Sequence, residues 1–235
     1  MRRRCCCAIL AIIFLFKESR AWGESQMRKM TMDRPDTIET PHSVPARHFQ
    51  IETSLFSTTH DDGTNDYSIL PTLLKLGLLN WCDLELGLEP YVHTSASGFG
   101  DTLLRFKANL YGNDAGPFSI ATIPFVVFPN EEGIIFPMEL ELSEEWSVAL
   151  EMEYDSAAEF INIISLGHDF TEKFGMFGEF FTQVRREDNF PWVGRFDTGF
   201  TYALTENFVA DGAVNIGLTE AAENVNPFVG FSYRH

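Results

Sequence analysis

The chain has 235 residues and a formal net charge of −17, and 45% of its residues are hydrophobic and 14% aromatic. This length suits one sizeable domain, and an acidic surface repels nucleic acid, so we predict no nucleic-acid partner. Phe alone contributes 22 residues. Aromatic and β-branched residues dominate the short apolar runs, which favours strands.

The first 21 residues have the pattern of an export signal. Arg2 to Arg4 form a positive start, Cys5 to Phe16 form an apolar stretch, and Ser19 and Ala21 occupy the −3 and −1 positions of a cleavage site. The apolar stretch is too short for a spanning helix, which needs ~20 residues. We therefore predict a signal peptide over residues 1–21. Its removal leaves Cys82 as the remaining cysteine, so no disulfide framework is expected.

The mature chain divides into two parts. Residues 22–47 are polar and punctuated by proline, and they predict an extended lead-in that is either periplasmic or plug-like. From residue 48 to residue 235, apolar runs recur between turn signals without a helical period. This second part is the predicted barrel.

Two kinds of turn alternate along residues 48–235. Tight turns are predicted at 79–83, 111–117, 142–146, 170–174 and 204–208, and longer polar loops at 60–65, 94–98, 129–133, 155–159, 186–189 and 219–226. These connections join about twelve strands and place both termini at the tight-turn end. The pattern is typical of an all-β, transmembrane, antiparallel up-and-down β-barrel.

Alternation within the strands supports the barrel. From Trp192 to Leu204, aromatic and apolar residues occupy one face and polar or charged residues the other. A soluble sandwich also alternates, but the export signal and the aromatic strand ends favour a membrane barrel. Residues 118–128 and 160–166 are apolar on both faces. Two interpretations of them stay open: a tightly filled patch of the lumen, or an apolar stripe along a channel.

The charges on the inward faces are the candidate site residues. We predict that they line the lumen and set its selectivity, either as ion pairs that fill it or as the walls of a wet channel. They are Glu52, Lys75, Glu85, Glu89, Arg105, Lys107, Glu139, Glu141, Glu151, Glu153, Glu179, Arg185, Arg195, Asp197 and Asp211. Carboxylates outnumber bases among them, which favours cations or neutral solutes.

We predict no catalytic residues, no metal site and no cofactor. The histidines lack a neighbouring nucleophile and orienting group, and His168 is interpreted as a structural residue on an apolar strand face. Asp61, Asp62 and Asp66 are interpreted as an exposed acidic loop rather than a calcium site.

The last strand has the alternation by which barrels are recognised for assembly. Val229, Phe231 and Tyr233 alternate with Gly230, Ser232 and Arg234, and His235 stands where a terminal aromatic residue is usual. The barrel-assembly machinery is therefore a predicted partner, together with outer-membrane lipid.

Ordered motifs along the mature chain resemble those of a known family. They are Asp33-Arg34-Pro35-Asp36, Val44-Pro45, His48 to Glu52, Gly98 to Asp101, and Gly217-Leu218 leading into Asn226 to Arg234. The chain resembles the outer-membrane transporter-like β-barrels named for the MetA pathway of phenol degradation. The resemblance implies a barrel for uptake or efflux of small, often aromatic compounds.

The expected function is a passive channel or transporter for small solutes, including aromatic or hydrophobic ones, in the bacterial outer membrane. Two alternatives stay open: a structural or adhesive barrel without transport, and a barrel-embedded lipid-modifying enzyme. An enzyme is not expected. The role of Asp33 to Asp36 is left open between a plug inside the barrel and a periplasmic docking segment.

Overall fold

The computed structural model describes residues 27–61, 64–94, 97–114, 116–156, 159–186 and 191–235. The predicted signal peptide, residues 1–21, lies outside these ranges. Within them the chain forms β-segments, and no helix is long and apolar enough to cross a membrane.

The β-segments follow one another along the chain. They are β1 (Phe49–Asp61), β2 (Thr64–Ile69), β3 (Thr72–Leu79), β4 (Cys82–Leu88), β5 (Tyr91–His93), β6 (Ser97–Gly98), β7 (Thr102–Tyr111), β8 (Phe118–Phe128), β9 (Glu131–Glu141), β10 (Trp146–Asp155), β11 (Glu159–Asp169), β12 (Phe174–Arg185), β13 (Val193–Thr205), β14 (Phe208–Gly217) and β15 (Val225–Arg234).

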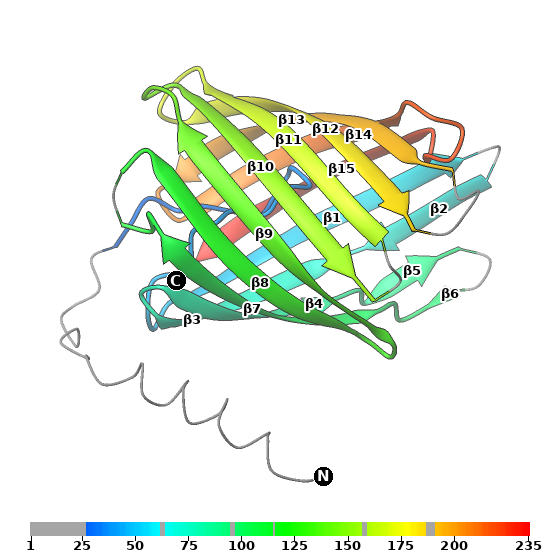
Figure 1. The fold of residues 1–235 in the computed structure, drawn as a ribbon, viewed down its shortest axis with the longest axis horizontal. Coiled ribbons are helices and arrows are strands. Elements are labelled where there is room, and N and C mark those ends of the chain that lie inside the picture. The colour runs from blue at the N-terminus through cyan, green and yellow to red at the C-terminus, as the bar shows by residue number, and fades with distance from the viewer. Residues whose placement is uncertain (1–26, 62–63, 95–96, 115, 157–158, 187–190) are drawn as a thin grey trace, which may run out of the picture.

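These segments form one antiparallel sheet that closes on itself (Figure 1). The last segment, β15, pairs with β1 from Gln50 opposite Arg234 to His60 opposite Val225. Closure removes the sheet edges that would otherwise expose unpaired backbone groups. Three strands are interrupted, so β2 with β3, β4 with β5, and β6 with β7 each count as one. The predicted barrel of twelve antiparallel strands is confirmed.

Proline explains two of the interruptions. Leu70 and Pro71 separate β2 from β3, and Glu89 and Pro90 separate β4 from β5. Proline has no backbone N–H to donate to a ladder, and Leu70 adopts a left-handed φ of 56°. β1 therefore pairs with β3 in its first half and with β2 in its second half.

The tight turns gather at one end of the barrel, where the C-terminus also lies (Figure 1). We call this the tight-turn end and the opposite one the long-loop end. Two predicted loops are wrong in length. β1 and β2 stay paired as far as Asp61 opposite Thr64, so their connection is shorter than the loop expected over 60–65. β8 ends at Phe128 and β9 begins at Glu131, so Pro129 and Asn130 alone connect them where a loop over 129–133 was expected.

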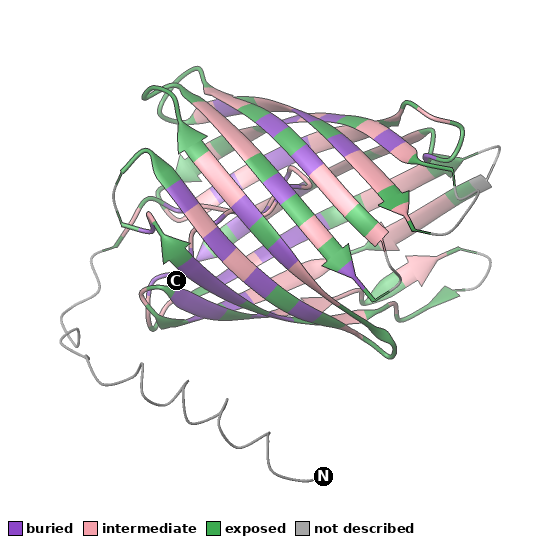
Figure 2. Ribbon diagram, in the orientation of Figure 1, coloured by how far each residue is buried: buried purple, intermediate pink, exposed green. Residues whose placement is uncertain are grey.

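Burial alternates along the strands of the wall, as Figure 2 shows, and the two faces differ in chemistry. On β10, Leu150 points outward and is 45% exposed, whereas its neighbour Glu151 points inward and is 3% exposed. Most large exposed residues are apolar, and most buried ones in the wall are polar or charged. This inside-out arrangement suits a barrel surrounded by lipid.

Aromatic rings form a band around the tight-turn end. Phe49 lies 6.5 Å from Tyr233 across the closing strands, Phe170 lies 5.8 Å from Phe174, and Trp146 stacks on His168 at 4.1 Å, all between ring centroids. Such rings anchor barrels at the membrane–water interface.

The outward face generates the first prediction. Leu150→Arg should lower the free energy of unfolding by about 2–4 kcal/mol, because a cation would face hydrocarbon near the middle of the wall. Urea unfolding in lipid vesicles measures the change. Leu142→Arg, in a tight turn, should cost about 1 kcal/mol or less because that end meets the interface. Equal effects of the two variants would contradict a lipid-facing Leu150.

Candidate functional site

The lead-in enters the barrel from the tight-turn end and folds back inside it (Figure 1). Its contacts reach almost every part of the wall. Arg28 donates to the carbonyl of Asn80 at 3.0 Å, and the carbonyl of Thr31 accepts from Gln50 at 2.7 Å. Ile38, further along the lead-in, is 3% exposed and packs against Ile163 and Phe181.

Asp33 lies at the centre of the lead-in's attachment. Its carboxylate contacts the ammonium of Lys75 at 2.5 Å, the ammonium of Lys107 at 2.8 Å and the guanidinium of Arg105 at 3.0 Å. Its backbone N–H donates to Glu52 at 3.0 Å. Burial alone would raise the pKa of Asp33, but these three cations outweigh it and hold that pKa well below its usual range.

The same cations also contact carboxylates of the wall. Arg105 donates to Glu85 at 2.6 Å and pairs with Glu39 of the lead-in. Lys75 pairs with Glu52, and Lys107 lies 3.3 Å from Glu85. Five predicted lumen residues, from β1, β3, β4 and β7, thus meet in one ion-pair network that Asp33 and Glu39 complete. We call this the Asp33 network.

The opposite wall holds the lead-in by its backbone. The N–H groups of Thr37 and Ile38 each donate to Glu179 at 3.1 Å, and the N–H of Glu39 donates to Glu151 at 2.7 Å. Carboxylates that accept backbone N–H groups satisfy donors that would be costly to bury alone.

Arg34 occupies a separate seat on β1, β14 and β15. Its guanidinium donates to the two oxygens of Asp211 at 2.6 and 3.3 Å and to the hydroxyl of Ser54 at 2.6 Å. Its Cζ lies 5.5 Å from the centre of the Phe228 ring. We call Asp211, Ser54 and Phe228 the Arg34 seat.

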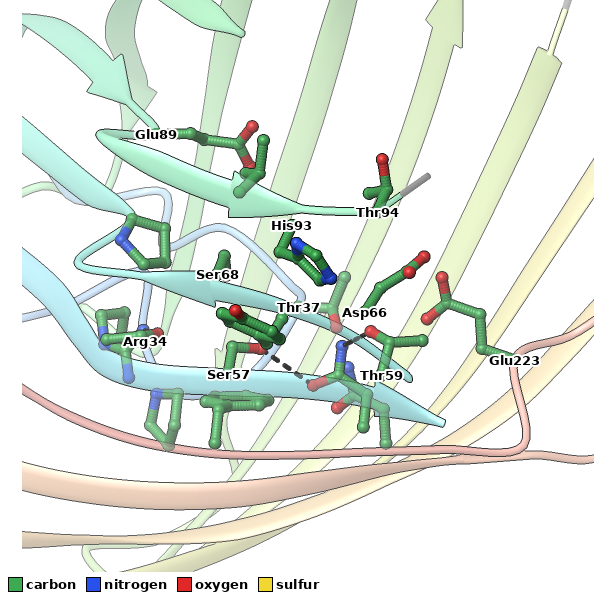
Figure 3. A pocket seen from close by; sticks show the side chains of 18 of the residues that line it. Arg34, Thr37, Ser57, Thr59, Asp66, Ser68, Glu89, His93, Thr94 and Glu223 are labelled. Atoms are coloured by element: carbon green, nitrogen blue, oxygen red, sulfur yellow. Dashed lines mark hydrogen bonds between the residues drawn. The ribbon is translucent and has the colours of Figure 1, made fainter. Parts of the chain in front are cut away.

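Two cavities lie on either side of the lead-in. The larger, about 460 Å³, is at the long-loop end and is shown in Figure 3. We call it the vestibule. Arg34, Asp36 and Thr37 form part of its wall, and so do Asp66 and Glu223. The smaller cavity, about 170 Å³, is in the tight-turn half between the lead-in and β9 to β12. Asp36 lines both cavities.

The remaining predicted lumen residues lie outside the Asp33 network. Arg195 donates to Asp197 at 2.8 Å, and Arg185 pairs with Glu159. Glu89 lines the vestibule, and Glu139 lines the smaller cavity. The Oε2 atom of Glu139 lies 3.5 Å from Nε2 of His42. Glu153 is half-buried on β10, and Glu141 is exposed at the tight-turn end of β9.

Two residues that bind the lead-in or its partners were absent from the predicted set. Asp83, fully buried, accepts the N–H of Val44 at 2.6 Å, and Glu39 pairs with Arg105. Asp83 stands in the inward alternation of β4 with Glu85, so the strand pattern itself carried its signal. Glu39 lies in the lead-in, where no periodicity tells which way a side chain points.

The doubly apolar strands are packed inside the barrel. Ile123 and Phe125 of β8 pack with Ile135 of β9, and all three are 6% exposed or less. Ile163 of β11 packs against Ile38 of the lead-in. Of the two interpretations kept open for these strands, a filled patch of the lumen fits the described side chains.

His168, interpreted from the sequence as a structural residue, contacts an aromatic ring and a backbone carbonyl. His168 stacks on Trp146 at 4.1 Å, and its Nδ1 lies 3.1 Å from the carbonyl of Glu145. It therefore belongs to the aromatic band. Across the described ranges, no three His, Cys, Asp or Glu side chains converge as metal ligands.

A family model matches this sequence over residues 32–133 and 142–235, and the family is described as "Putative MetA-pathway of phenol degradation". The chain belongs to this family. The match begins at Met32, immediately before the residues that the Asp33 network and the Arg34 seat hold. Among curated protein sequences, none matches the chain.

Solved porin structures share the fold. A KdgM porin is 12% identical, with a TM-score of 0.57 over 78% of this chain and 98% of that one. A KdgM porin in complex with disordered oligogalacturonate is 11% identical, with a TM-score of 0.58 over 79% and 98%. A NanC porin is 10% identical, with a TM-score of 0.58 over 79% and 98%. This member of the MetA-pathway family therefore has an outer-membrane porin-like barrel fold.

The Asp33 network generates the second prediction. Asp33→Asn should lower the free energy of unfolding by about 3–5 kcal/mol, because it leaves three buried cations with one carboxylate fewer. Asp114→Asn, which removes the partner of Arg28 at an exposed position, should cost about 0–1 kcal/mol. Denaturant unfolding of both variants in detergent tests the difference. Similar losses would mean that Asp33 is not the main attachment of the lead-in.

Proposed function

We propose that this chain is a passive channel of the bacterial outer membrane that passes small cationic or neutral solutes, aromatic ones included, beside its lead-in. The observation that carries the proposal is the position of Asp36. It lines both the vestibule and the smaller cavity, so a route between the two ends of the barrel runs past this residue. A modest movement of the lead-in around Asp36 would join the cavities.

The distribution of charge favours a route on one side of the lumen. Lys75, Arg105 and Lys107 come from β3 and β7, and all three form ion pairs within the Asp33 network. On β9 to β12 the inward charges near the smaller cavity are instead Glu139, Glu151 and Glu179. An acidic wall raises the local concentration of cations and repels anions.

The vestibule continues the same preference. Asp36, Asp66, Glu89 and Glu223 line it, and among the described residues Arg34 is its one Lys or Arg side chain. Hydroxyl groups of Ser57, Thr59 and Ser68, labelled in Figure 3, supply hydrogen-bonding groups for a neutral solute. The cavity is of the size that ordinarily holds a small organic molecule.

A structural barrel without transport is the second candidate. The observation that favours it is the lead-in itself, which lies between the two cavities and is fixed by the Asp33 network. If that segment never shifts, no solute passes. Conductance distinguishes the two functions directly.

The third prediction concerns ion selectivity. The purified full-length mature protein in planar bilayers should show a small conductance with a preference for cations. Glu151→Gln with Glu153→Gln should reduce the cation-to-anion permeability ratio by at least roughly fivefold, because each removed unit charge contributes ~1 kcal/mol at about 4 Å from an ion in water. Glutamine keeps an acceptor oxygen for the N–H of Glu39, so the lead-in should remain seated.

Glu144→Gln is the matched control, since Glu144 is exposed in a tight turn and should leave the ratio unchanged. A silent bilayer across salts and small amines would leave the structural barrel as the better function. An unaltered ratio in the double variant would move the selective region away from β10.

The fourth prediction concerns location and orientation. The protein should fractionate with outer membranes and migrate differently on gels before and after heating. A cysteine at Asn130, at the long-loop end, should react with an impermeant reagent on intact cells. Cysteines at Glu172 and Glu206, at the tight-turn end, should need a permeabilised envelope. Recovery as a freely soluble protein, or the reverse labelling, would overturn this placement.

A further inference from the structure

The Arg34 seat has the geometry of a site for a planar cation. Asp211 receives two donors from one guanidinium, at 2.6 Å through Nη2 and at 3.3 Å through Nε. Ser54 receives a third donor at 2.6 Å, and the Phe228 ring lies 5.5 Å from Cζ. A carboxylate that takes two parallel donors, together with an aromatic face, recognises guanidinium and amidinium groups better than a compact ammonium.

The wall builds this seat by itself. Asp211 lies on β14, Ser54 on β1 and Phe228 on β15, whereas the guanidinium comes from the lead-in. The residues are well covered, with Asp211 and Ser54 each 4% exposed. Gly230 completes the space, because a Cβ at this position would collide with Arg34 and with the carbonyl of Thr53. The seat is therefore a preformed pocket whose occupant is attached to a separate segment.

The seat is also in reach of a solute. Arg34, Ser54 and Phe228 all line the vestibule, and Arg34 is labelled among its lining side chains in Figure 3. A cation that enters the vestibule meets Asp36, Asp66, Glu89 and Glu223 on its way to the seat. Charge thus concentrates cations in the same space that opens onto the guanidinium pocket.

We propose that the Arg34 seat is a binding site for solutes that carry a guanidinium or amidinium group, and that such a solute displaces Arg34 and loosens the lead-in. This deepens the proposed function, since it names a class of solute and the contact through which that solute would open the route. The binding half of the proposal does not depend on conduction. Arg34 is followed directly by Pro35 and Asp36, so release of its side chain removes one of the contacts that hold the part of the lead-in between the cavities.

The binding site is tested by filling an emptied seat. Arg34→Ala should lower the heating temperature at which the barrel unfolds in detergent, and millimolar methylguanidinium should restore part of that loss. Methylammonium at equal ionic strength should not, because it lacks the planar pair of donors. Arg34→Ala combined with Asp211→Asn should show no restoration. If methylguanidinium and methylammonium restore the unfolding temperature of Arg34→Ala equally, no guanidinium site exists.

Displacement is tested without relying on current. Ile38→Cys, in a Cys82→Ser background, places a thiol where the lead-in is 3% exposed. Methylguanidinium should accelerate its alkylation by roughly tenfold, the effect of removing ~1.4 kcal/mol from the seating of the lead-in. Methylammonium is again the control. An unchanged rate would overturn displacement, even if Arg34→Ala binds the ligand.

The two proposals fail in different ways. If bilayers are silent while methylguanidinium still protects Arg34→Ala and exposes Ile38→Cys, the channel is wrong and the binding site stands. If bilayers conduct selectively while methylguanidinium changes neither readout, the channel stands and the guanidinium site falls.

Discussion

The attraction between one carboxylate and three cations organises the interior of this barrel. Lys75, Arg105 and Lys107 lie almost fully inside the wall, where an isolated ammonium or guanidinium is very costly to bury. Wall carboxylates Glu52 and Glu85 offset part of that cost, and Asp33 reaches all three cations from the lead-in. The buried cations of the wall therefore have all their carboxylate partners only when the lead-in is inside the barrel. The path of the lead-in, the two cavities and the position of Asp36 all follow from this attachment.

The sequence carried most of the fold. Alternation such as Leu150 beside Glu151 reveals which side of a strand meets lipid, because a period of two has only two faces to assign. The alternation of tight turns and longer loops predicted the strand number, because each turn signal is contained in a few neighbouring residues. The interruptions at Leu70 and Pro71, and the short link at Pro129 and Asn130, were harder. Whether a proline breaks a strand or merely bounds a loop depends on the pairing of its neighbours.

The sequence predicted less of the candidate site than of the fold. Inward charges such as Glu85 and Arg105 were placed by strand alternation, but their shared partner, Asp33, lies in a segment without periodicity. No local rule states that a polar stretch will turn back into a lumen and offer its backbone N–H groups to Glu179 and Glu151. That arrangement depends on matching hydrogen-bond donors and acceptors more than a hundred residues apart in the chain, as with the N–H of Thr37 and the carboxylate of Glu179. The distinctive sequence from Asp33 to Asp36 marked the segment as unusual without indicating which residues it contacts.

The lead-in is bound to the wall on both sides of Arg34, through Asp33 and through Thr37, and these contacts make Arg34 a tethered ligand. A group held on a short flexible link reaches its site at an effective concentration of roughly millimolar order. Anything that competes for Asp211 and Ser54 must approach that range before it wins. The tether would then act as a threshold, keeping the Arg34 seat occupied by Arg34 when guanidinium solutes are scarce and yielding when they accumulate.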